Sequence, residues 1–328
     1  MKITLLNLSL ALSAATGMAS PVKAPTTREL FHFPNATFIE NIAVRPNGHL
    51  LLNTFDNGRM YTIDPSAPHI TPQVAAQLPD VASLTGITEI APDVFAVSGG
   101  NPVGSYSFQE GSLKVFVVDF VKGKKSHGKQ TPVVKKIADV PNTEILNGMT
   151  HLPKHPHIIL TADSVQGRIF RVDTKTGAVD IAFGDQKLAA GKDSSPPLGV
   201  NGIKIYDDYM YFTNSAQQFF GRIKITAKGD RAGDIEEIVT VADRSMAYDD
   251  FAMARDGTAY VGTHPSYLSK ITPDGKQTIL VGADNREILF APTSAALSRD
   301  ERKAYVITEG ASTMGGVNGG QVVEVTLC

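Results

Sequence analysis

Residues 201–212 of the chain read Asn-Gly-Ile-Lys-Ile-Tyr-Asp-Asp-Tyr-Met-Tyr-Phe, and this stretch contains two short runs separated by a polar turn. The first run, 201–205, is rich in small and apolar residues, and the second, 210–212, is largely aromatic. Runs of this length and composition, bounded by turn residues, are typical of β-strands. The stretch therefore predicts two consecutive strands.

The same pair of runs occurs six times along the chain. The first runs begin about 45, 62, 54, 48 and 44 residues apart, and each begins at a polar residue: Glu40, Thr85, Asn147, Asn201, Asp249 and Thr293. A period of about fifty residues is expected of propeller blades, each of which contains four antiparallel strands. The sequence therefore predicts an all-β fold, a six-bladed β-propeller.

The two ends of the chain predict how the ring closes. About 35 residues follow Thr293, enough for three strands that end at 322–325, and residues 28–33 form an orphan strand before the first blade. We expect this N-terminal strand to join the last blade, which closes the ring and leaves only short outer edges. The basic segment 121–129 is expected to be a hairpin tip within the longest blade.

The composition limits the classes of function. The chain of 328 residues has 31 Lys and Arg against 33 Asp and Glu, a net charge of -2, and 42% hydrophobic residues. This apolar content is too high for a disordered chain, and the charge gives no reason to expect binding to nucleic acid or to an anionic membrane. We expect a monomer or weak homodimer that binds an apolar small molecule.

The N-terminus has the features of a secretory signal. Lys2 is followed by the apolar run 3–15 and by small residues at 17 and 19. We therefore expect residues 1–19 to be a cleaved signal peptide and residues 20–328 to form the propeller, in the secretory pathway or outside the cell. The apolar run of about 13 residues is shorter than the roughly 20 that a membrane span needs.

Two further features depend on this location. Asn35, followed by Ala36 and Thr37, is a candidate N-glycosylation site, and the alternative is an unused sequon in a turn after Pro34. Cys328 is the single cysteine of the sequence. No intramolecular disulfide can form, so topology and packing must stabilise the fold.

In a propeller the innermost strand of each blade lines the axis, so the six polar starting residues should meet at one mouth of the channel. Glu40, Asn147, Asn201 and Asp249 would supply two carboxylates and two amide carbonyls there. This set of hard oxygens suits Ca²⁺ better than Mg²⁺, and the absence of His and Cys from it counts against Zn²⁺. The alternative is that these side chains satisfy backbone groups at strand starts.

Candidates for catalysis lie around the same mouth. Asp249, Thr85 and Thr293 belong to the ring of starting residues, and His264 follows a second strand. His264 could act as a general acid or base, or it could be a structural, hydrogen-bonded residue. The sequence has no G-x-S-x-G elbow and no H-E-x-x-H motif, so serine-hydrolase and zinc-protease functions have no support.

The loops between the second and third strands open on the same face and should form the walls of a pocket above the ion. They supply six aromatic and three polar candidates for substrate binding: Phe55, Tyr106, Phe108, Phe219, Phe220 and Tyr267, with Asp163, Gln217 and Glu309. Aromatic walls over a polar floor suit a largely apolar ligand that carries a few oxygens. For each aromatic residue, packing between neighbouring blades is the alternative.

The chain resembles the gluconolactonase and senescence-marker-protein-like six-bladed propellers over nearly its whole mature length. The resemblance is carried by four motifs, Phe-Ile-Glu at 38–40, Leu-Asn-Gly at 146–148, Val-Asn-Gly at 200–202 and Tyr-Asp-Asp-Phe at 248–251. It implies one divalent ion held by Glu40, Asn147, Asn201 and Asp249, with no organic cofactor. In the lactonases of this family the metal polarises the lactone carbonyl, and the position of Asp249 also supplies the base.

One departure from the sugar-lactone members changes the expected substrate. Those members carry an Arg two residues before the Asn of blade three, where this chain has Ile145. The framework motifs and the signal peptide instead resemble a secreted fungal branch that includes hetero-Diels-Alderases of tropolone sesquiterpenoid biosynthesis. This resemblance implies a pericyclase that joins a tropolone quinone methide to a humulene-type terpene. A metal-dependent lactonase or esterase for an apolar lactone, and a non-catalytic ligand-binding propeller, are the alternatives.

Overall fold

The structure is a computed structural model and describes residues 25–104, 106–126, 129–283, 285–313 and 316–327. Nearly all regular structure in these ranges is β-strand, with a single 3-10 turn, η1 (Arg286–Ile288). No helix in the described ranges is long and apolar enough to cross a membrane. The predicted signal peptide, residues 1–19, and Cys328 lie outside the described residues.

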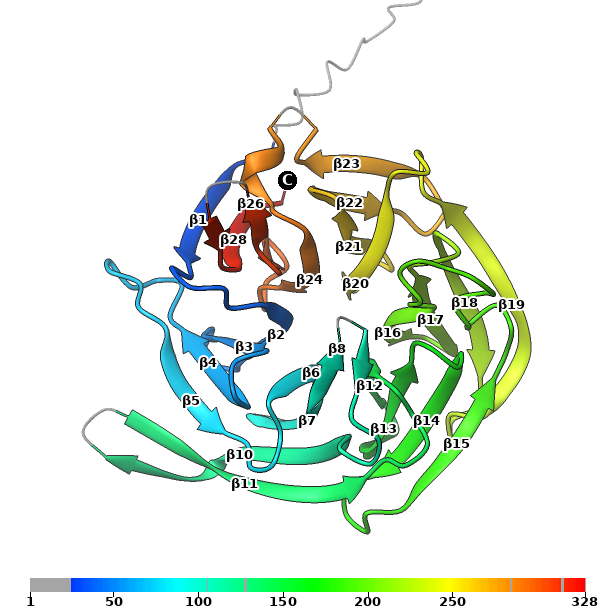
Figure 1. Cartoon of the computed structure of the whole chain (residues 1–328), viewed down its shortest axis with the longest axis horizontal. Helices are drawn as coiled ribbons and strands as arrows, with labels where there is room; N and C mark the ends of the chain where they lie inside the picture. Colours follow the sequence, from blue (N-terminus) through cyan, green and yellow to red (C-terminus); the bar gives the residue numbers. More distant parts are fainter. Residues whose placement is uncertain (1–24, 105, 127–128, 284, 314–315, 328) are drawn as a thin grey trace, which may run out of the picture.

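Six antiparallel sheets of four strands stand around a central axis (Figure 1). In the first three blades the strands, from the axis outward, are β2 (Ile39–Val44), β3 (Leu50–Thr54), β4 (Arg59–Ile63) and β5 (Gln73–Gln77); β6 (Ser83–Ala91), β7 (Val94–Gly100), β10 (Lys114–Ser126) and β11 (Lys129–Asp139); and β12 (Leu146–Leu152), β13 (His155–Asp163), β14 (Arg168–Asp173) and β15 (Val179–Gly184). The predicted first and second strands of these blades are therefore confirmed.

The other three blades repeat the pattern. Their strands, again from the axis outward, are β16 (Val200–Tyr206), β17 (Tyr209–Asn214), β18 (Phe219–Ile225) and β19 (Arg231–Thr240); β20 (Ala247–Met253), β21 (Ala259–His264), β22 (Tyr267–Ile271) and β23 (Gln277–Val281); and β24 (Pro292–Leu297), β25 (Lys303–Thr308), β28 (Gln321–Thr326) and β1 (Thr27–His32). Residues 201–212 cover most of the first two strands of blade four and the turn between them, as their composition predicts. The six-bladed propeller is confirmed.

The N-terminal strand closes the ring as predicted. β1 pairs with β28 in antiparallel register, with Thr27 opposite Val325 and Phe31 opposite Val322. The last blade therefore combines strands from both ends of the chain, and Figure 1 shows β1 on its outer side. Because the outermost strand comes from the start of the chain, the ring is fastened by main-chain hydrogen bonds rather than by a disulfide.

The hydrophobic core lies between adjacent blades. Alternate side chains of a strand point to opposite faces of its sheet, so each blade packs against both neighbours. In blade four, Phe219 packs with Phe212 in a cluster that includes Leu160 of blade three, whereas Phe220 packs edge-on against Phe251 of blade five. The axis itself is left for polar residues.

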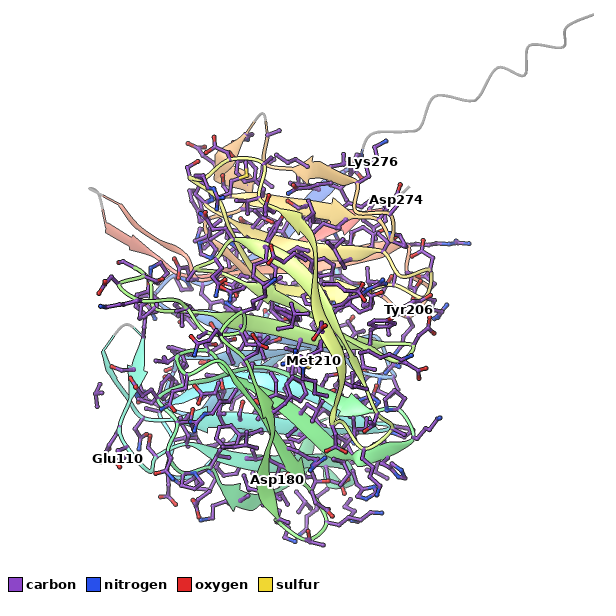
Figure 2. The ribbon with its side chains drawn as sticks, turned by 90° about the vertical axis from the view of Figure 1, so that its right-hand side faces the viewer. Glu110, Asp180, Tyr206, Met210, Asp274 and Lys276 are labelled. Atoms are coloured by element: carbon purple, nitrogen blue, oxygen red, sulfur yellow. The ribbon has the colours of Figure 1, made fainter. Side chains whose placement is uncertain are left out.

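Two small hairpins project from one face of the disc, β8 (Pro102–Gly104) with β9 (Ser107–Phe108), and β26 (Ala311–Thr313) with β27 (Gly316–Asn318). Figure 2 shows the disc edge-on, with Glu110 on the face of these hairpins and Tyr206 and Lys276 on the opposite side. Residues 121–126 and 129 of the basic segment belong to the long β10–β11 ribbon that extends beyond blade two (Figure 1), and the predicted tip at 127–128 lies outside the described residues.

Candidate functional site

A cavity of about 540 Å³ lies at the axial mouth where β2, β12, β16 and β20 begin. Its lining falls into two groups. The polar group consists of Glu40, Tyr106, Asn147, Asn201, Ser215, Asp249, His264 and Glu309. The apolar group includes Phe38, Phe55, Pro102, Ile145, Pro196, Leu198 and Ala247.

Four of the six predicted starting residues line this cavity: Glu40, Asn147, Asn201 and Asp249. The two threonines do not. The Thr85 hydroxyl is buried against the Ser98 hydroxyl at 2.8 Å, and the Thr293 hydroxyl donates to the Ile39 carbonyl at 2.7 Å. The Thr85 hydroxyl is hydrogen-bonded within its own blade, and the Thr293 hydroxyl is hydrogen-bonded to the next blade. The positions of Thr85 and Thr293 therefore do not support the predicted catalytic role.

The two asparagines present amide oxygens without partners. Oδ1 of Asn147 and Oδ1 of Asn201 are buried and accept no hydrogen bond from the described residues. The Asn201 amide is oriented by its other end, because Nδ2 donates to the Ser215 hydroxyl at 3.0 Å and that hydroxyl donates to the Tyr248 carbonyl at 2.7 Å. A buried acceptor without a partner is costly, so a bound ligand with positive charge would satisfy both oxygens.

The carboxylates of the floor destabilise one another's charge. Burial raises the pKa of Glu40 well above the usual carboxyl range, and the charges of Asp249, Glu309 and Asp250 raise it further. Burial also raises the pKa of Asp249, although the hydrogen bond to His264 acts in the opposite direction. Burial and the Asp249 charge raise the pKa of Glu309, while the His264 charge opposes them. The floor is therefore a site that favours cations.

His264 lies at the end of β21, with Nε2 3.1 Å from Oδ2 of Asp249. Burial alone would lower the pKa of the imidazole, but the hydrogen bond and charge of Asp249, with the charge of Glu309, leave that pKa above its usual value. The protonated ring is thus favoured, and it faces the same cavity as Tyr106. Burial and the charges of Glu309 and Asp249 raise the pKa of the Tyr106 phenol, which keeps it a donor.

Asp250 does not line the cavity, and its carboxylate is held by two side chains. Lys204 donates from Nζ to Oδ1 of Asp250 at 2.6 Å, and Asn41 donates from Nδ2 to Oδ2 at 2.9 Å. These three side chains come from β16, β20 and β2 and so connect the innermost strands of blades four, five and one. A divalent cation at the floor would offset the burial and the charge repulsion that raise the pKa of the Glu40, Asp249 and Glu309 carboxyl groups.

The donor set fits a calcium site by its chemistry. Two carboxylates and two amide oxygens are hard ligands, and the amide oxygens are unsatisfied without an ion. Among the described residues, no three His, Cys, Asp or Glu side chains gather as a metal cluster. Ion binding here would therefore depend on Asn147 and Asn201 as well as on the two carboxylates.

The apolar wall is built around Phe55. Its ring stacks on Phe38 with 4.7 Å between centroids and meets Phe108 edge-on at 6.0 Å. Asp56, the next residue, accepts hydrogen bonds from Arg59 at 3.1 Å and from the Tyr61 hydroxyl at 2.5 Å. The loop that carries Phe55 is therefore held on both sides, and the stacked pair presents a fixed surface to the cavity.

Four other aromatic residues predicted for the wall lie in the core instead. Phe108 is buried behind Phe55, Phe219 and Phe220 pack on opposite faces of blade four, and Tyr267 packs in the cluster between blades four and five. Phe219, Phe220 and Tyr267 follow short turns at the start of a third strand and fall on a blade face, whereas Phe108 lies in β9 of the β8–β9 hairpin. Packing between blades is the correct interpretation for these four.

Two polar residues predicted to bind substrate also have structural partners. Asp163 is fully buried and pairs with Arg168 at 2.6 Å, and its Oδ1 accepts from the Gln166 amide at 3.1 Å. Gln217 donates from Nε2 to the Ala189 carbonyl at 2.7 Å. Both side chains fasten the turns that carry them. Glu309, Phe55 and Tyr106, by contrast, line the cavity.

Several lining residues were not predicted from the sequence. Phe38 lies just before β2, and Pro196 and Leu198 lie in the segment before β16. Of these lining residues, the sequence drew attention only to Ile145, because it stands two residues before Asn147, where sugar-lactone members carry an Arg. The same offset before Asn201 holds Gly199, so the neighbouring Leu198 had no comparable motif to mark it.

No family model matches the chain. A protein of Sarocladium schorii, named as a candidate hetero-Diels-Alderase, is 28% identical over 331 residues, covering 90% of this chain and 80% of the relative. A second protein with that name, from a Phoma species, is 26% identical over 320 residues, covering 90% of this chain and 89% of its own. The predicted resemblance is thus confirmed over most of the chain.

Solved structures show the same fold. A luciferin-regenerating enzyme superposes with a TM-score of 0.66 at 14% identity, covering 93% of this chain and 96% of its own. Regucalcin of Agrobacterium tumefaciens, described as a calcium-binding protein, superposes with a TM-score of 0.60 at 15% identity, covering 92% and 95%.

The fold and site thus define a six-bladed propeller with a half-apolar axial cavity over an acidic floor, similar in architecture to regucalcin. In sequence it resembles proteins named for hetero-Diels-Alder cyclisation, and the prediction of an enzyme of the cyclase class agrees with those names.

Proposed function

We propose that the chain is a pericyclase that catalyses an intermolecular hetero-Diels-Alder cycloaddition. The observation that carries this proposal is the division of one cavity into an apolar wall around Phe55 and Leu198 and a polar side around His264 and Glu309. Two reactants of unlike polarity can lie side by side in such a cavity. The names of both sequence relatives support the same reaction class.

The reaction asks little covalent chemistry of the protein. A four-atom oxadiene and an alkene form one C–C and one C–O bond as three π bonds become one, with no leaving group and no net proton transfer. The protein can contribute by holding the reactants in one facial orientation, and by donors directed at the oxygen that gains charge. The His264 imidazole and the Tyr106 phenol are two donor groups that face the cavity, and the neighbouring carboxylates act to raise the pKa of each.

As substrates we propose a tropolone quinone methide and a humulene-type terpene. The tropolone unit carries the oxygens and would lie on the side of His264, Asp249 and Glu309. The terpene is a hydrocarbon ring with few polar groups and would lie against Phe38, Phe55 and Leu198. A volume of about 540 Å³ is within the range of small-molecule sites, which supports a cavity large enough for both reactants.

The floor is proposed to hold one divalent cation, with Ca²⁺ the best match. Glu40 and Asp249 would bind through carboxylates, and Asn147 and Asn201 through their unpartnered amide oxygens. Such an ion, when bound, supplies fixed positive charge and Lewis acidity at the floor. The protein's own contribution is to orient the donors, as Ser215 does for Asn201.

The direct test supplies the purified protein with both reactants, the quinone methide being generated in the assay from a stable precursor. The proposed function predicts one predominant stereoisomer of the cycloadduct at a rate above the uncatalysed mixture. A product ratio identical to that of the uncatalysed reaction would reject the proposal. A variant with Phe55→Ala and Leu198→Ala lacks the apolar wall and serves as the control. It should give a product ratio close to that of the uncatalysed reaction, which would show that the wall, and not the protein surface in general, directs the cycloaddition.

A metal-dependent lactonase or esterase is a second candidate, because Asp249 is hydrogen-bonded to His264 beside the proposed ion site. In that reaction water attacks the acyl carbon, the alkoxide leaves, and the carboxylate accepts the proton from water. Chelation and Asp249→Asn would both abolish turnover of an apolar lactone. Hydrolysis that is lost in Asp249→Asn, with no effect of the protein on cycloadduct ratio, would favour this function. A ligand bound without turnover would instead indicate a binding propeller.

A further inference from the structure

A second cavity, also of about 540 Å³, lies where the last blade meets the first. It shares Phe55 with the axial cavity and is otherwise separate from it. Phe31, Phe33 and Tyr61 form its aromatic lining, with ring centroids 5.1 Å apart for the two phenylalanines and 5.3 Å apart for Phe33 and Tyr61. The proposed reaction does not use this cavity.

Asn35, the first residue of the sequon, is exposed and lines the same cavity. Its turn is fixed, because the Phe33 amide donates to the Gly320 carbonyl at 3.0 Å and the Gly320 amide donates to the Thr37 carbonyl at 2.7 Å. A methyl group on Gly319 would lie 2.0 Å from the Asn35 carbonyl oxygen, so only glycine permits this approach. The sequon is thus held beside the aromatic lining.

We propose that Asn35 carries an N-linked glycan and that the cavity is the seat of its first N-acetylglucosamine. The axial C–H groups of a pyranose carry slight positive charge and pack well on the negative faces of aromatic rings. Phe31 and Tyr61, which are half-buried, would supply those rings, and Phe33, which is buried, packs edge-on against both. Asp56 and Arg59, which line the same cavity, would meet hydroxyl and acetamido groups of the sugar.

The modification follows known group-transfer chemistry. Nδ2 of Asn35 attacks the anomeric carbon of a lipid-linked oligosaccharide diphosphate, the bond from that carbon to the diphosphate oxygen breaks, and the amide loses one proton. The co-substrate and the transferase belong to the secretory pathway, so the proposal requires entry into it. It is independent of the reaction in the axial cavity.

The seat would stabilise the closure of the ring. Phe31 and Phe33 belong to β1 and its end, whereas Tyr61 and Pro72 belong to blade one. A sugar between them would bridge the strand that closes blade six to the neighbouring blade. We expect glycosylation to raise the unfolding temperature, on the order of 2 °C or more for a chain of this size, and the first sugar to account for most of that rise.

The test expresses the full chain in a eukaryotic secretory host, as wild type and as Asn35→Gln, with Thr37→Ser as the control that keeps the sequon. Intact and peptide mass spectrometry measure the occupancy of Asn35. The unfolding temperature is then compared for the intact glycoprotein, for protein trimmed by an endoglycosidase to a single N-acetylglucosamine, and for Asn35→Gln. We expect an occupied site and a trimmed protein that keeps the higher unfolding temperature.

An unoccupied Asn35 in the secreted protein would overturn the proposal. A trimmed protein that melts with Asn35→Gln would overturn the seat, because distal sugars would then account for the effect. Phe31→Leu adds a double-mutant cycle, in which the difference between trimmed protein and Asn35→Gln should fall by at least half. If Phe31→Leu does not fold, the comparison of trimmed and unglycosylated protein still decides the proposal.

Discussion

Nε2 of His264 lies 3.1 Å from Oδ2 of Asp249, and both side chains line the axial cavity. The carboxylate accepts a hydrogen bond from the ring, and this contact acts to raise the pKa of His264, so the pair places an imidazole beside an otherwise acidic floor. Replacing His264 should therefore show whether the cavity accelerates the reaction or only encloses the reactants.

Replacing His264 by Gln should slow the cycloaddition on the order of tenfold to a hundredfold, because a charge-assisted hydrogen bond to the reacting oxygen is lost. Single-turnover rates with saturating reactants measure the effect. His155→Gln, at an exposed histidine of β13, is the matched control and should react as the wild type does. Equal rates for the two variants would show that His264 only supports the turn.

Without divalent cations, the protein should become less stable as pH rises, because the carboxyl groups of the floor hold their protons more strongly in the folded state. Burial and mutual repulsion raise the folded-state pKa of Glu40, Asp249 and Glu309, and the pKa of His264 is also raised. The folded state then binds more protons than the unfolded state at neutral pH, so stability falls as pH rises. In chelator, the unfolding temperature should increase from about pH 8 to about pH 5.

Calcium should reverse this dependence at neutral pH, because an ion compensates the same charges and binds only the folded state. Calorimetric scans with chelator and with added Ca²⁺ measure both effects. Glu40→Gln should reduce the pH dependence in chelator and weaken the response to Ca²⁺. If the wild type and Glu40→Gln respond equally to Ca²⁺, the ion binds elsewhere.

The wall residues should control the stereochemistry more than the rate. Phe55 stacks on Phe38, and Phe55→Ala would remove most of the surface that holds the terpene in one orientation. We expect a several-fold loss of diastereomer selectivity, equivalent to roughly 1 kcal/mol for an aromatic contact, with a smaller change in total product. Chiral chromatography of the products measures the ratio. Phe183→Ala, in the core of blade three, would change stability but should leave the ratio intact.

Asp56 should affect the same ratio without touching substrate in the axial cavity. Its carboxylate is held by Arg59 and Tyr61, and it follows Phe55 directly. Asp56→Asn weakens these contacts, so the Phe55 ring should gain freedom and selectivity should fall, while Asp56→Glu should restore part of it. An unchanged product ratio in Asp56→Asn would show that stacking on Phe38 alone fixes the ring.

The repeat made the fold predictable, because polar residues at the starts of six strands, repeated at blade spacing, are typical of a propeller. The same geometry located Glu40, Asn147, Asn201 and Asp249. The innermost strands of all blades line the axis, so their first residues meet at one mouth of the channel. It failed for Thr85 and Thr293, whose hydroxyls are short enough to bond to backbone or to a neighbouring hydroxyl.

The wall was less predictable because a loop residue can face the axis or either neighbouring blade. Phe219 and Phe220 are adjacent in sequence and point to opposite faces of blade four, so neither reaches the cavity. Phe38 and Leu198 lie before strand starts, where the sequence has no periodicity that would orient them. Which side of a turn faces the axis depends on main-chain contacts between blades, and a single sequence does not contain these.

The ion pair between Lys204 of β16 and Asp250 of β20 gives the final prediction. Lys204 donates to Asp250 at 2.6 Å, and the Asp250 side chain is only 1% exposed. Lys204→Met would leave a buried carboxylate with the Asn41 amide and a backbone amide as its remaining partners, and breaking such a pair costs about 3–5 kcal/mol. Urea unfolding at neutral pH should show this loss. Lys187→Met breaks the exposed pair with Glu237 and should cost at most about 1 kcal/mol. Equal losses in the two variants would mean that solvent already screens Asp250 in the folded protein.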